Sequence, residues 1–263
     1  MKSGAETINP YDNRREKSVQ VEEMFDSIAP AYDFMNSAMS FGLHRNWRTR
    51  ALNAAGNALG TTAPKRILDV ATGTGDVAFD LHRRYPEAKI TGVDLSEGML
   101  EIAREKLKKL DKSEENIIFM QGDSLDLKFG DNTFDLVTVA YGVRNFENLA
   151  KGLRELYRVL NPGGTICIIE LSEPSSKTTR WLYRLYARTL IPAAGRLISG
   201  DSRASSYLPE SIAAAPQRDN LTAIMREAGF DACEWKSMTM GTATYYIGHK
   251  NASEHAADES KRL

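Results

Sequence analysis

Short apolar runs alternate with amphipathic stretches between residues 66 and 171. Five apolar runs predict strands at residues 66–70, 89–94, 116–121, 134–141 and 165–171. Three stretches of helical periodicity lie between them, at residues 76–85, at 96–110 with Ser96 as the N-cap, and at 148–160. Strands that alternate with helices are typical of an α/β protein with a mostly parallel sheet.

The flanking segments predict additions to one domain over residues 18–250. Residues 1–17 and 251–263 are polar and read as flexible tails. Residues 18–60 predict a helical lid, 175–216 an insertion on the acceptor side with an amphipathic helix at 179–191, and 199–217 mostly loop. Asn161-Pro162-Gly163-Gly164 predicts a turn. A helix at 218–228 and a strand pair at 230–238 and 242–249 close the domain.

The stretch 67–76, ILDVATGTGD, is where the predicted sheet would bind a ligand. A buried strand breaks into Gly73-Thr74-Gly75, and a helix follows. Strand, glycine turn and helix in this order are typical of the first turn of a nucleotide-binding α/β sheet. Asp94 ends the next strand about 20 residues later, where a carboxylate reaches ribose hydroxyls.

The charges around this loop favour one ligand class over another. Gly73, Gly75 and Ala78 also fit the dinucleotide fingerprint, but Asp69 and Asp76 place two carboxylates at the loop. A pyrophosphate requires free helix N–H groups without acids nearby, whereas a ligand with an ammonium and a sulfonium gains from acids. S-adenosylmethionine is such a ligand, and we predict that it is the cofactor.

Polar residues follow two later strands of the predicted sheet. Asp123 and Ser124 come after the third strand, where Asp123 can accept from an adenine amino group and Ser124 can offer its backbone N–H. Arg144 and Asn145 come after the fourth strand, where a second substrate would lie. The alternatives are a plain turn at 122–124 and an Arg144 that pairs with a structural acid, Glu147 or Asp123.

Composition excludes several classes of protein. The formal net charge of −1 gives no general attraction to nucleic acid. Two cysteines, Cys167 and Cys233, lie in apolar runs and predict small buried side chains, and we expect no metal site. No apolar run approaches the ~18 residues of a membrane span. We therefore expect a cytoplasmic protein.

Longer motifs make the sequence similar to a known family. These motifs are YDFMNSAMSFGLHRNW at 32–47, GVRN at 142–145, RVLNPGGTICIIELS at 158–172 and YLPESI at 207–212. Together with the glycine loop they resemble the menaquinone and ubiquinone C-methyltransferase family, a branch of the Rossmann-like class I methyltransferases, over about residues 21–250. Two departures are Ala140, where some members carry serine, and Ala71, where methyltransferases usually have glycine.

The resemblance implies a seven-stranded, mostly parallel sheet with helices on both faces. It also implies a methyl transfer from S-adenosylmethionine to a ring carbon of a prenylated quinol. We expect demethylmenaquinol as the acceptor, and a polyprenyl methoxybenzoquinol remains an alternative. The cofactor residues that the glycine pattern and the resemblance together predict are Asp69, Gly73, Thr74, Gly75, Asp94, Asp123 and Ser124.

The predicted chemistry needs a phenolate and a base. Arg144 is expected to stabilise the phenolate, and Asn145 to add a hydrogen bond. His44, Tyr32 and Asp33 are the candidate bases, which the sequence does not rank. An NAD-dependent oxidoreductase and a cofactor-binding regulator without catalysis are the competing classes.

The predicted acceptor implies contact with a membrane. A prenylated quinol resides in the bilayer, so we expect transient contact with the inner face of the cell membrane through the helix that carries Trp181 and Leu185. A homodimer is compatible with the same resemblance.

Overall fold

Seven strands form one sheet at the centre of the protein. The computed structural model describes residues 4–110, 116–181, 183–186, 189 and 202–252. The strands are β1 Arg66–Val70, β2 Lys89–Asp94, β3 Ile117–Gln121, β4 Phe134–Ala140, β5 Leu160–Leu171, β6 Asp231–Met238 and β7 Ala243–His249. Their order is β3-β2-β1-β4-β5-β7-β6, with β7 antiparallel to both neighbours and the other pairs parallel. The predicted α/β class is confirmed, and the chain reverses its direction across the sheet between β1 and β4, where such sheets bind ligands.

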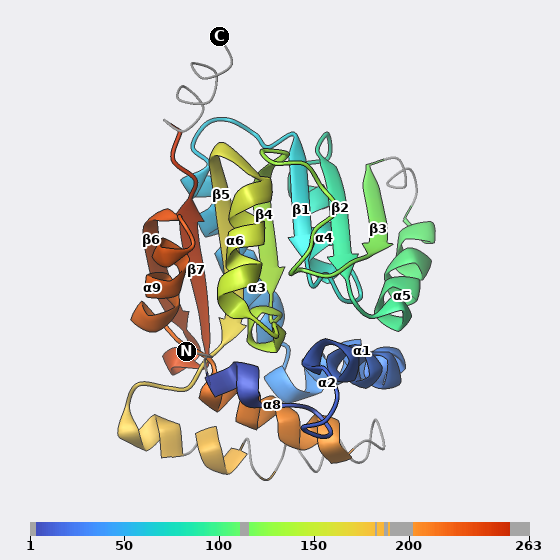
Figure 1. Cartoon of the computed structure of the whole chain (residues 1–263), viewed down its shortest axis with the longest axis vertical. Coiled ribbons are helices and arrows are strands. Elements are labelled where there is room, and N and C mark those ends of the chain that lie inside the picture. The colour runs from blue at the N-terminus through green and yellow to red at the C-terminus, as the bar shows by residue number, and fades with distance from the viewer. Residues whose placement is uncertain (1–3, 111–115, 182, 187–188, 190–201, 253–263) are drawn as a thin grey trace.

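Helices cover both faces of the sheet and its lower edge (Figure 1). One face carries α3 Leu43–Ala58, α4 Asp76–Arg84 and α5 Glu97–Lys108, and the other carries α6 Leu149–Val159 and α9 Asp219–Glu227. Below the carboxyl ends of the parallel strands lie α1 Lys17–Ile28, α2 Tyr32–Ser40 and α8 Ser202–Ala214. Short 3-10 turns are η1 Gly4–Thr7, η2 Ala29–Ala31, η3 Val143–Asn145 and η4 Thr239–Gly241. The predicted N-cap is confirmed, because Ser96 Oγ accepts from Met99 N at 3.1 Å.

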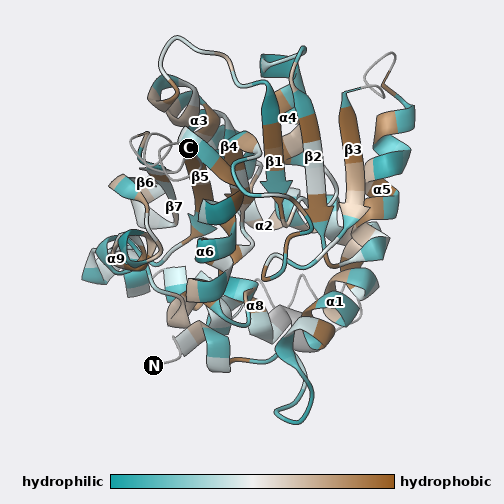
Figure 2. Ribbon diagram, turned by 45° about the horizontal axis from the view of Figure 1, so that its top comes forward, coloured by the Kyte–Doolittle hydropathy of each residue, from teal (hydrophilic) through white to brown (hydrophobic). Residues whose placement is uncertain are grey.

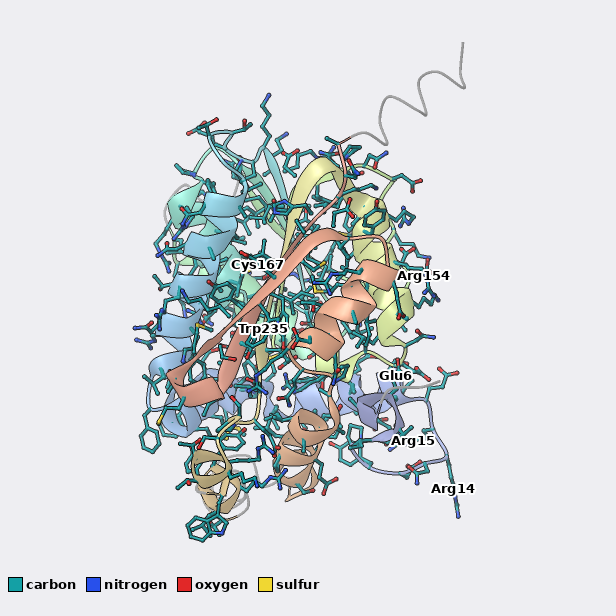
Figure 3. The ribbon with its side chains drawn as sticks, turned by 90° about the vertical axis from the view of Figure 1, so that its left-hand side faces the viewer. Glu6, Arg14, Arg15, Arg154, Cys167 and Trp235 are labelled. Atoms are coloured by element: carbon teal, nitrogen blue, oxygen red, sulfur yellow. The ribbon has the colours of Figure 1, made fainter. Side chains whose placement is uncertain are left out.

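The central strands β1, β4 and β5 are buried on both sides, which explains their unbroken hydrophobic runs in the sequence (Figure 2). Neighbouring residues of a strand point to opposite faces. Accordingly, Ile67 packs under α3 and α4, whereas Leu68 packs under α6 and α9, and both are fully buried. Cys167 and Cys233 are buried and unpaired by disulfide, as predicted. Figure 3 shows Cys167 in the middle of the sheet.

Residues 4–17 are packed on the body, so the predicted flexible tail is wrong for this segment. Lys17 Nζ donates to Ala5 O at 2.6 Å and to Arg144 O at 3.2 Å. Glu6 Oε1 accepts from the backbone N of Leu149 at 2.7 Å, at the start of α6, and Figure 3 shows Glu6 at that end of the molecule. These contacts join residues far apart in the sequence, which local composition does not reveal.

Three further predictions differ from the structure. Most of the predicted loop 199–217 is α8, with Pro209 inside it, because Tyr207 packs among the apolar residues of α1 and α2. The predicted turn 161–164 belongs to β5, where Gly163 takes φ +79° and its N–H donates to Lys250 O at 2.8 Å. In the predicted helix 179–191, residues 179–181, 183–186 and 189 are helical, and the others, Arg188 and Ile191 among them, lie outside the described residues.

Neither a membrane-spanning helix nor a cluster of metal ligands is found in the described part of the chain. No helix there is long and apolar enough to cross a membrane. In the same residues, no group of three or more histidine, cysteine or acidic side chains is arranged to hold a metal ion.

Candidate active site

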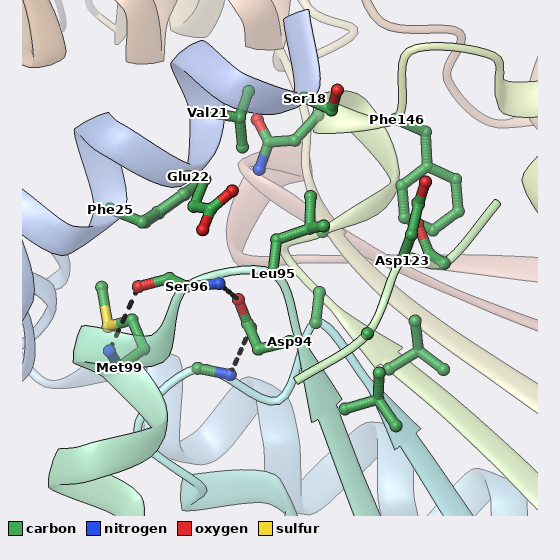
Figure 4. Close-up of a pocket in the computed structure, with 18 of the residues that line it drawn as sticks. Ser18, Val21, Glu22, Phe25, Asp94, Leu95, Ser96, Met99, Asp123 and Phe146 are labelled. Carbon is green, nitrogen blue, oxygen red and sulfur yellow. Dashed lines mark hydrogen bonds between the residues drawn. The ribbon is translucent and has the colours of Figure 1, made fainter. Parts of the chain in front are cut away.

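The glycine loop is held by the carboxylate that ends β2. Asp94 Oδ2 accepts from Gly73 N at 2.8 Å, and Asp94 Oδ1 accepts from Ser96 N at 3.0 Å (Figure 4). Gly73 takes φ +56°, a conformation that favours glycine. Burial raises the pKa of Asp94, although the backbone N–H groups of Ser96 and Gly73 oppose this rise. Asp94 therefore fixes the loop and also presents its carboxyl group to the cavity beside it.

This cavity lies where the strands end, and we call it the cofactor cavity. Its wall is formed by the ends of β1, β2 and β4, the loop after β3, and α1. Four acids line it, namely Glu22, Asp94, Asp123 and Glu147. Among the described residues no lysine, arginine or histidine lines it. A cavity with this charge suits a cationic ligand and opposes a pyrophosphate.

Four of the seven predicted cofactor residues line the cofactor cavity. They are Gly73, Asp94, Asp123 and Ser124. Asp123 also accepts from Leu125 N at 2.8 Å, so its carboxylate is held in place. Ala140, the position without the expected serine, is part of the wall as well.

The other three lie behind the wall. Asp69 is 1% exposed, and its two carboxylate oxygens accept from Thr72 Oγ1 and Thr138 Oγ1, each at 2.6 Å. Thr74 Oγ1 donates to Asp33 at 2.6 Å, and a Cβ on Gly75 would meet Phe119 at 2.8 Å. Their direct contact with a cofactor stays a prediction, and in the structure they support the loop from behind.

The two acids that were predicted to attract a cationic ligand are not among those that line the cofactor cavity. Asp76 is paired with Arg48 at 2.7 Å and with Lys106 at 3.0 Å, and neither Asp69 nor Asp76 lines the cavity. Burial raises the pKa of Asp69 to about 7, so its charge is weakened too. The negative wall comes instead from Glu22, Glu147, Asp94 at the end of β2 and Asp123 after β3. Glu22 lies in the lid helix α1, and the sequence of the glycine loop alone does not show that it lines this cavity.

A second cavity, about 380 Å³ in volume, adjoins the first, and we call it the acceptor cavity. Apolar and aromatic side chains from α1, α2, α3, α8 and η4 form most of its wall. Phe25, Tyr32 and Tyr141 line both cavities and therefore mark their junction. A ligand in the acceptor cavity would meet the cofactor at these three residues.

Three of the four predicted catalytic residues line the acceptor cavity, namely Arg144, Tyr32 and His44. His44 Nδ1 lies 2.7 Å from Ser40 Oγ. Burial lowers the pKa of His44, so its ring is neutral near pH 7. Asn145 instead lines the cofactor cavity, where its Oδ1 accepts from the Tyr207 hydroxyl at 3.0 Å. The Arg-Asn pair thus straddles the junction.

Two groups near Arg144 were missed in the sequence. Arg144 Nη1 donates to Glu170 Oε1 at 2.8 Å, so its acid partner is Glu170, not Glu147 or Asp123. A charged residue inside the buried run of β5 was the signal that could have revealed it. Tyr141, directly after β4, was read as the end of a strand, although it takes φ +58° and faces both cavities.

Asp33, one of the three candidate bases, does not line the acceptor cavity. Its carboxylate pairs with Lys106 Nζ at 2.6 Å and accepts from Thr74. Together these contacts tie α2 to the glycine loop and to α5.

An acidic cavity at the reversal point of a seven-stranded sheet, open to an apolar cavity beside it, is the arrangement of a methyltransferase that uses S-adenosylmethionine. The sequence matches the ubiE/COQ5 methyltransferase family over residues 13–250, and the chain belongs to that family. The predicted cofactor and reaction class are thereby confirmed.

Individual relatives agree with this assignment. The chain is 46% identical to a demethylmenaquinone methyltransferase of Porphyromonas gingivalis, over 93% of this chain and 98% of that one. It is 42% identical to a ubiquinone/menaquinone biosynthesis C-methyltransferase of Geotalea daltonii, over 89% and 98%. A solved structure of a SAM-dependent methyltransferase of Thermotoga maritima shares the fold, with a TM-score of 0.59, 19% identity, and coverage of 87% of this chain and 99% of that one.

Proposed function

We propose that this protein methylates a ring carbon of a prenylated quinol, with demethylmenaquinol as the acceptor. The observation that carries the proposal is the junction of the two cavities at Phe25, Tyr32 and Tyr141. An apolar, aromatic cavity suits a flat quinol ring, and the junction brings that ring against the cofactor's methyl group. The naphthoquinol ring is favoured by the relatives named demethylmenaquinone methyltransferase.

The reaction adds one methyl group and releases one proton. A ring hydroxyl loses its proton, and the negative charge spreads onto the neighbouring ring carbon. That carbon attacks the methyl group while the S–CH3 bond breaks, and the bonding pair stays on sulfur to give S-adenosylhomocysteine. The ring carbon then loses its hydrogen as a proton, and the ring oxygen regains one.

In this proposal Arg144 stabilises the phenolate and His44 is the base. Arg144 lines the acceptor cavity and donates hydrogen bonds from a fixed position, which stabilises the phenolate. His44 is neutral and lines the same cavity, so it is a better base than Asp33, which is already paired. Tyr32 orients the ring at the junction, and Asn145 acts from the cofactor side.

The mouth of the acceptor cavity suits contact with a lipid surface. Phe41 and Met240 line the cavity and are 79% and 74% exposed. Trp181 and Leu185 are also exposed, and the helix that carries them packs against α2 through a ring contact between Tyr186 and Phe41. We propose that these side chains enter the membrane surface transiently, so that the prenyl chain of the acceptor never leaves the bilayer.

One turnover assay tests the proposed function. The protein is supplied with methyl-labelled S-adenosylmethionine and either a short-chain demethylmenaquinol or a methoxybenzoquinol with the same chain. We expect label on a ring carbon, with a higher kcat/KM for the naphthoquinol. Faster methylation of the benzoquinol would reassign the ring, and no label on either quinol would contradict the proposal.

A further inference from the structure

Unpaired polar atoms gather in the wall of the acceptor cavity. Within the described residues, three buried side-chain polar atoms lack a hydrogen-bond partner, namely His82 Nδ1, the Tyr141 hydroxyl and Arg144 Nε. His82 lies in α4 and lines neither cavity, whereas Tyr141 and Arg144 both line the acceptor cavity. Folded proteins pair nearly all buried polar groups, so two unpaired groups in one cavity wall indicate a ligand that pairs with them.

The backbone at Tyr141 is strained, and its surroundings fix the side chain. Tyr141 follows β4 directly, takes φ +58°, and donates its N–H to Ile169 O at 2.7 Å. Its side chain packs against the buried cluster of Trp47, Met238 and Ala243. A non-glycine residue keeps this left-handed conformation only where its neighbours enforce it, and such residues gather at ligand sites. The neighbours of Tyr141 therefore hold its ring at the junction of the two cavities.

The hydroxyls of Tyr32, Tyr141 and Tyr207, which all lie near Arg144, are used differently. The Tyr207 hydroxyl donates to Asn145, and the Tyr32 side chain bonds to Asn36. In the part of the chain that the structure describes, the Tyr141 hydroxyl alone of the three has no partner. Burial raises the pKa of Tyr141, so its hydroxyl keeps its proton at neutral pH and can donate it in a hydrogen bond.

The guanidinium of Arg144 is held through Nη1, so its Nε–H remains available to a ligand. Nη1 donates to Glu170 Oε1 at 2.8 Å and also to the carbonyl oxygen of Tyr141. The guanidinium is thus tied to the backbone of the same residue that carries the unpaired hydroxyl. Its Nε–H stays without a partner and is always a donor.

We propose that the Tyr141 hydroxyl and Arg144 Nε–H together bind one oxygen of the acceptor, the ring oxygen next to the carbon that receives the methyl group. The position follows from the junction, because Tyr141 lines both cavities and an oxygen bound there lies beside the cofactor. This inference rests on the proposed function and names a second donor for its phenolate.

A pair of donors also sets the kind of acceptor. A ring oxygen accepts from both groups and gains more as its negative charge develops. An amine at this position needs its one lone pair to attack the methyl group and would leave the two donors unpaired, which disfavours nitrogen acceptors. The pair thus selects phenols and hydroquinones.

The test is Tyr141→Phe, which removes the hydroxyl and keeps the ring. Tyr245→Phe is the matched control, since Tyr245 packs on the same cluster and lines neither cavity. Single-turnover methyl transfer to a short-chain demethylmenaquinol is measured across pH, beside S-adenosylhomocysteine affinity and thermal unfolding. We expect the Tyr141→Phe rate near pH 7 to fall about 10- to 100-fold, somewhat below the loss of a whole oxyanion donor, because Arg144 remains. The rising limb of the rate profile, where the hydroxyl of the bound acceptor ionises, should move to higher pH, since that hydroxyl loses a donor that favours its ionised form.

The structure also predicts what the substitution leaves unchanged. The thermal midpoint of Tyr141→Phe should match or exceed that of wild type, because the hydroxyl has no protein partner to lose, and cofactor affinity should stay within twofold. A rate within twofold of wild type, or an equal loss in Tyr245→Phe, would overturn the inference, as would a parallel loss of cofactor affinity. If wild type methylates no quinol, the proposed function fails and this inference fails with it. An active wild type with an unchanged Tyr141→Phe contradicts this inference alone.

Discussion

Arg144 and Glu170 form a buried ion pair between the loop after β4 and the end of β5. Nη1 and Oε1 are 2.8 Å apart, and the two side chains are 6% and 3% exposed. Glu170 Oε2 also accepts from the backbone N of Arg144 at 3.3 Å. The charge of Arg144 is therefore balanced before any acceptor binds. A phenolate would be stabilised by directed donors in a fixed position, not by an excess positive charge.

Arg144→Ala should reduce both the rate and the stability. The methyl-transfer rate should fall by about 10²–10³, the range for one preorganised donor. Because Glu170 would stay buried without its partner, the free energy of unfolding should fall by about 3–5 kcal/mol. Single-turnover kinetics and urea unfolding measure the two effects. Arg154→Ala is the control, since Arg154 lies on the exposed side of α6 (Figure 3), and a normal rate in Arg144→Ala would remove Arg144 from the chemistry.

Replacing both partners should separate these effects. In Arg144→Met with Glu170→Leu no buried charge is left, so we expect most of the lost stability to return. The rate should stay as low as in Arg144→Ala, because the donor is still absent. Recovery of the rate together with stability would show that Arg144 only supports the fold.

Asp94→Ala should weaken S-adenosylhomocysteine binding by about 2–4 kcal/mol, because a charged acceptor of hydrogen bonds is lost from the cavity wall. Asp135→Ala is a matched control. Asp135 Oδ2 also accepts from two backbone N–H groups, those of Lys65 and Arg66, at 2.7 and 3.0 Å, but it does not line the cofactor cavity. Calorimetry measures S-adenosylhomocysteine affinity for both folded variants. An affinity of Asp94→Ala equal to that of Asp135→Ala would exclude Asp94 as a cofactor contact.

Asp69 should make the stability of the protein depend on pH. Its pKa is about 7 in the fold and 3.8 in the unfolded chain. Between these values the folded state holds a proton that the unfolded state has released, so stability falls as pH rises from about 4 to 7, by up to about 1.4 kcal/mol per pH unit. Asp69→Asn should flatten this slope in urea unfolding of the cofactor-free protein. An unchanged slope would mean that Asp69 is ionised in the fold.

Lipid binding should depend on the side chains at the mouth of the acceptor cavity. Phe41→Ser with Met240→Ser, and separately Trp181→Ser with Leu185→Ser, should each lower flotation with anionic liposomes. Ile118→Ser is the control, because Ile118 is 55% exposed on β3 and lines neither cavity. Flotation equal to wild type in both pairs would place the membrane contact elsewhere.

Local patterns in the sequence were enough to predict the strands, the glycine loop and the cap at Ser96. They also located Asp94, Asp123 and Arg144, because the ends of parallel strands meet at one edge of the sheet. The partner of Arg144 could not be predicted, since Glu170 is 26 residues away and pairing depends on which strands become neighbours. The same limit applied to Glu22 and to α8, whose places are set by tertiary packing. The prediction that Asp76 would attract a cationic ligand was wrong because Asp76 is paired with Arg48 and Lys106, which come from two other helices.

The contacts of residues 4–17 have a consequence for how the protein folds as it is synthesised. Lys17 reaches the backbone of a residue 127 positions later, Glu6 that of a residue 143 positions later, and η1 also packs on α8. Residues 4–17 therefore gain these contacts only after residues up to 143 positions later have been synthesised, and non-local contacts of this kind form slowly. The central sheet can assemble while the wall around Arg144 is still open. Binding competence is then a late event, gained only when η1 and α1 have met η3, α6 and α8.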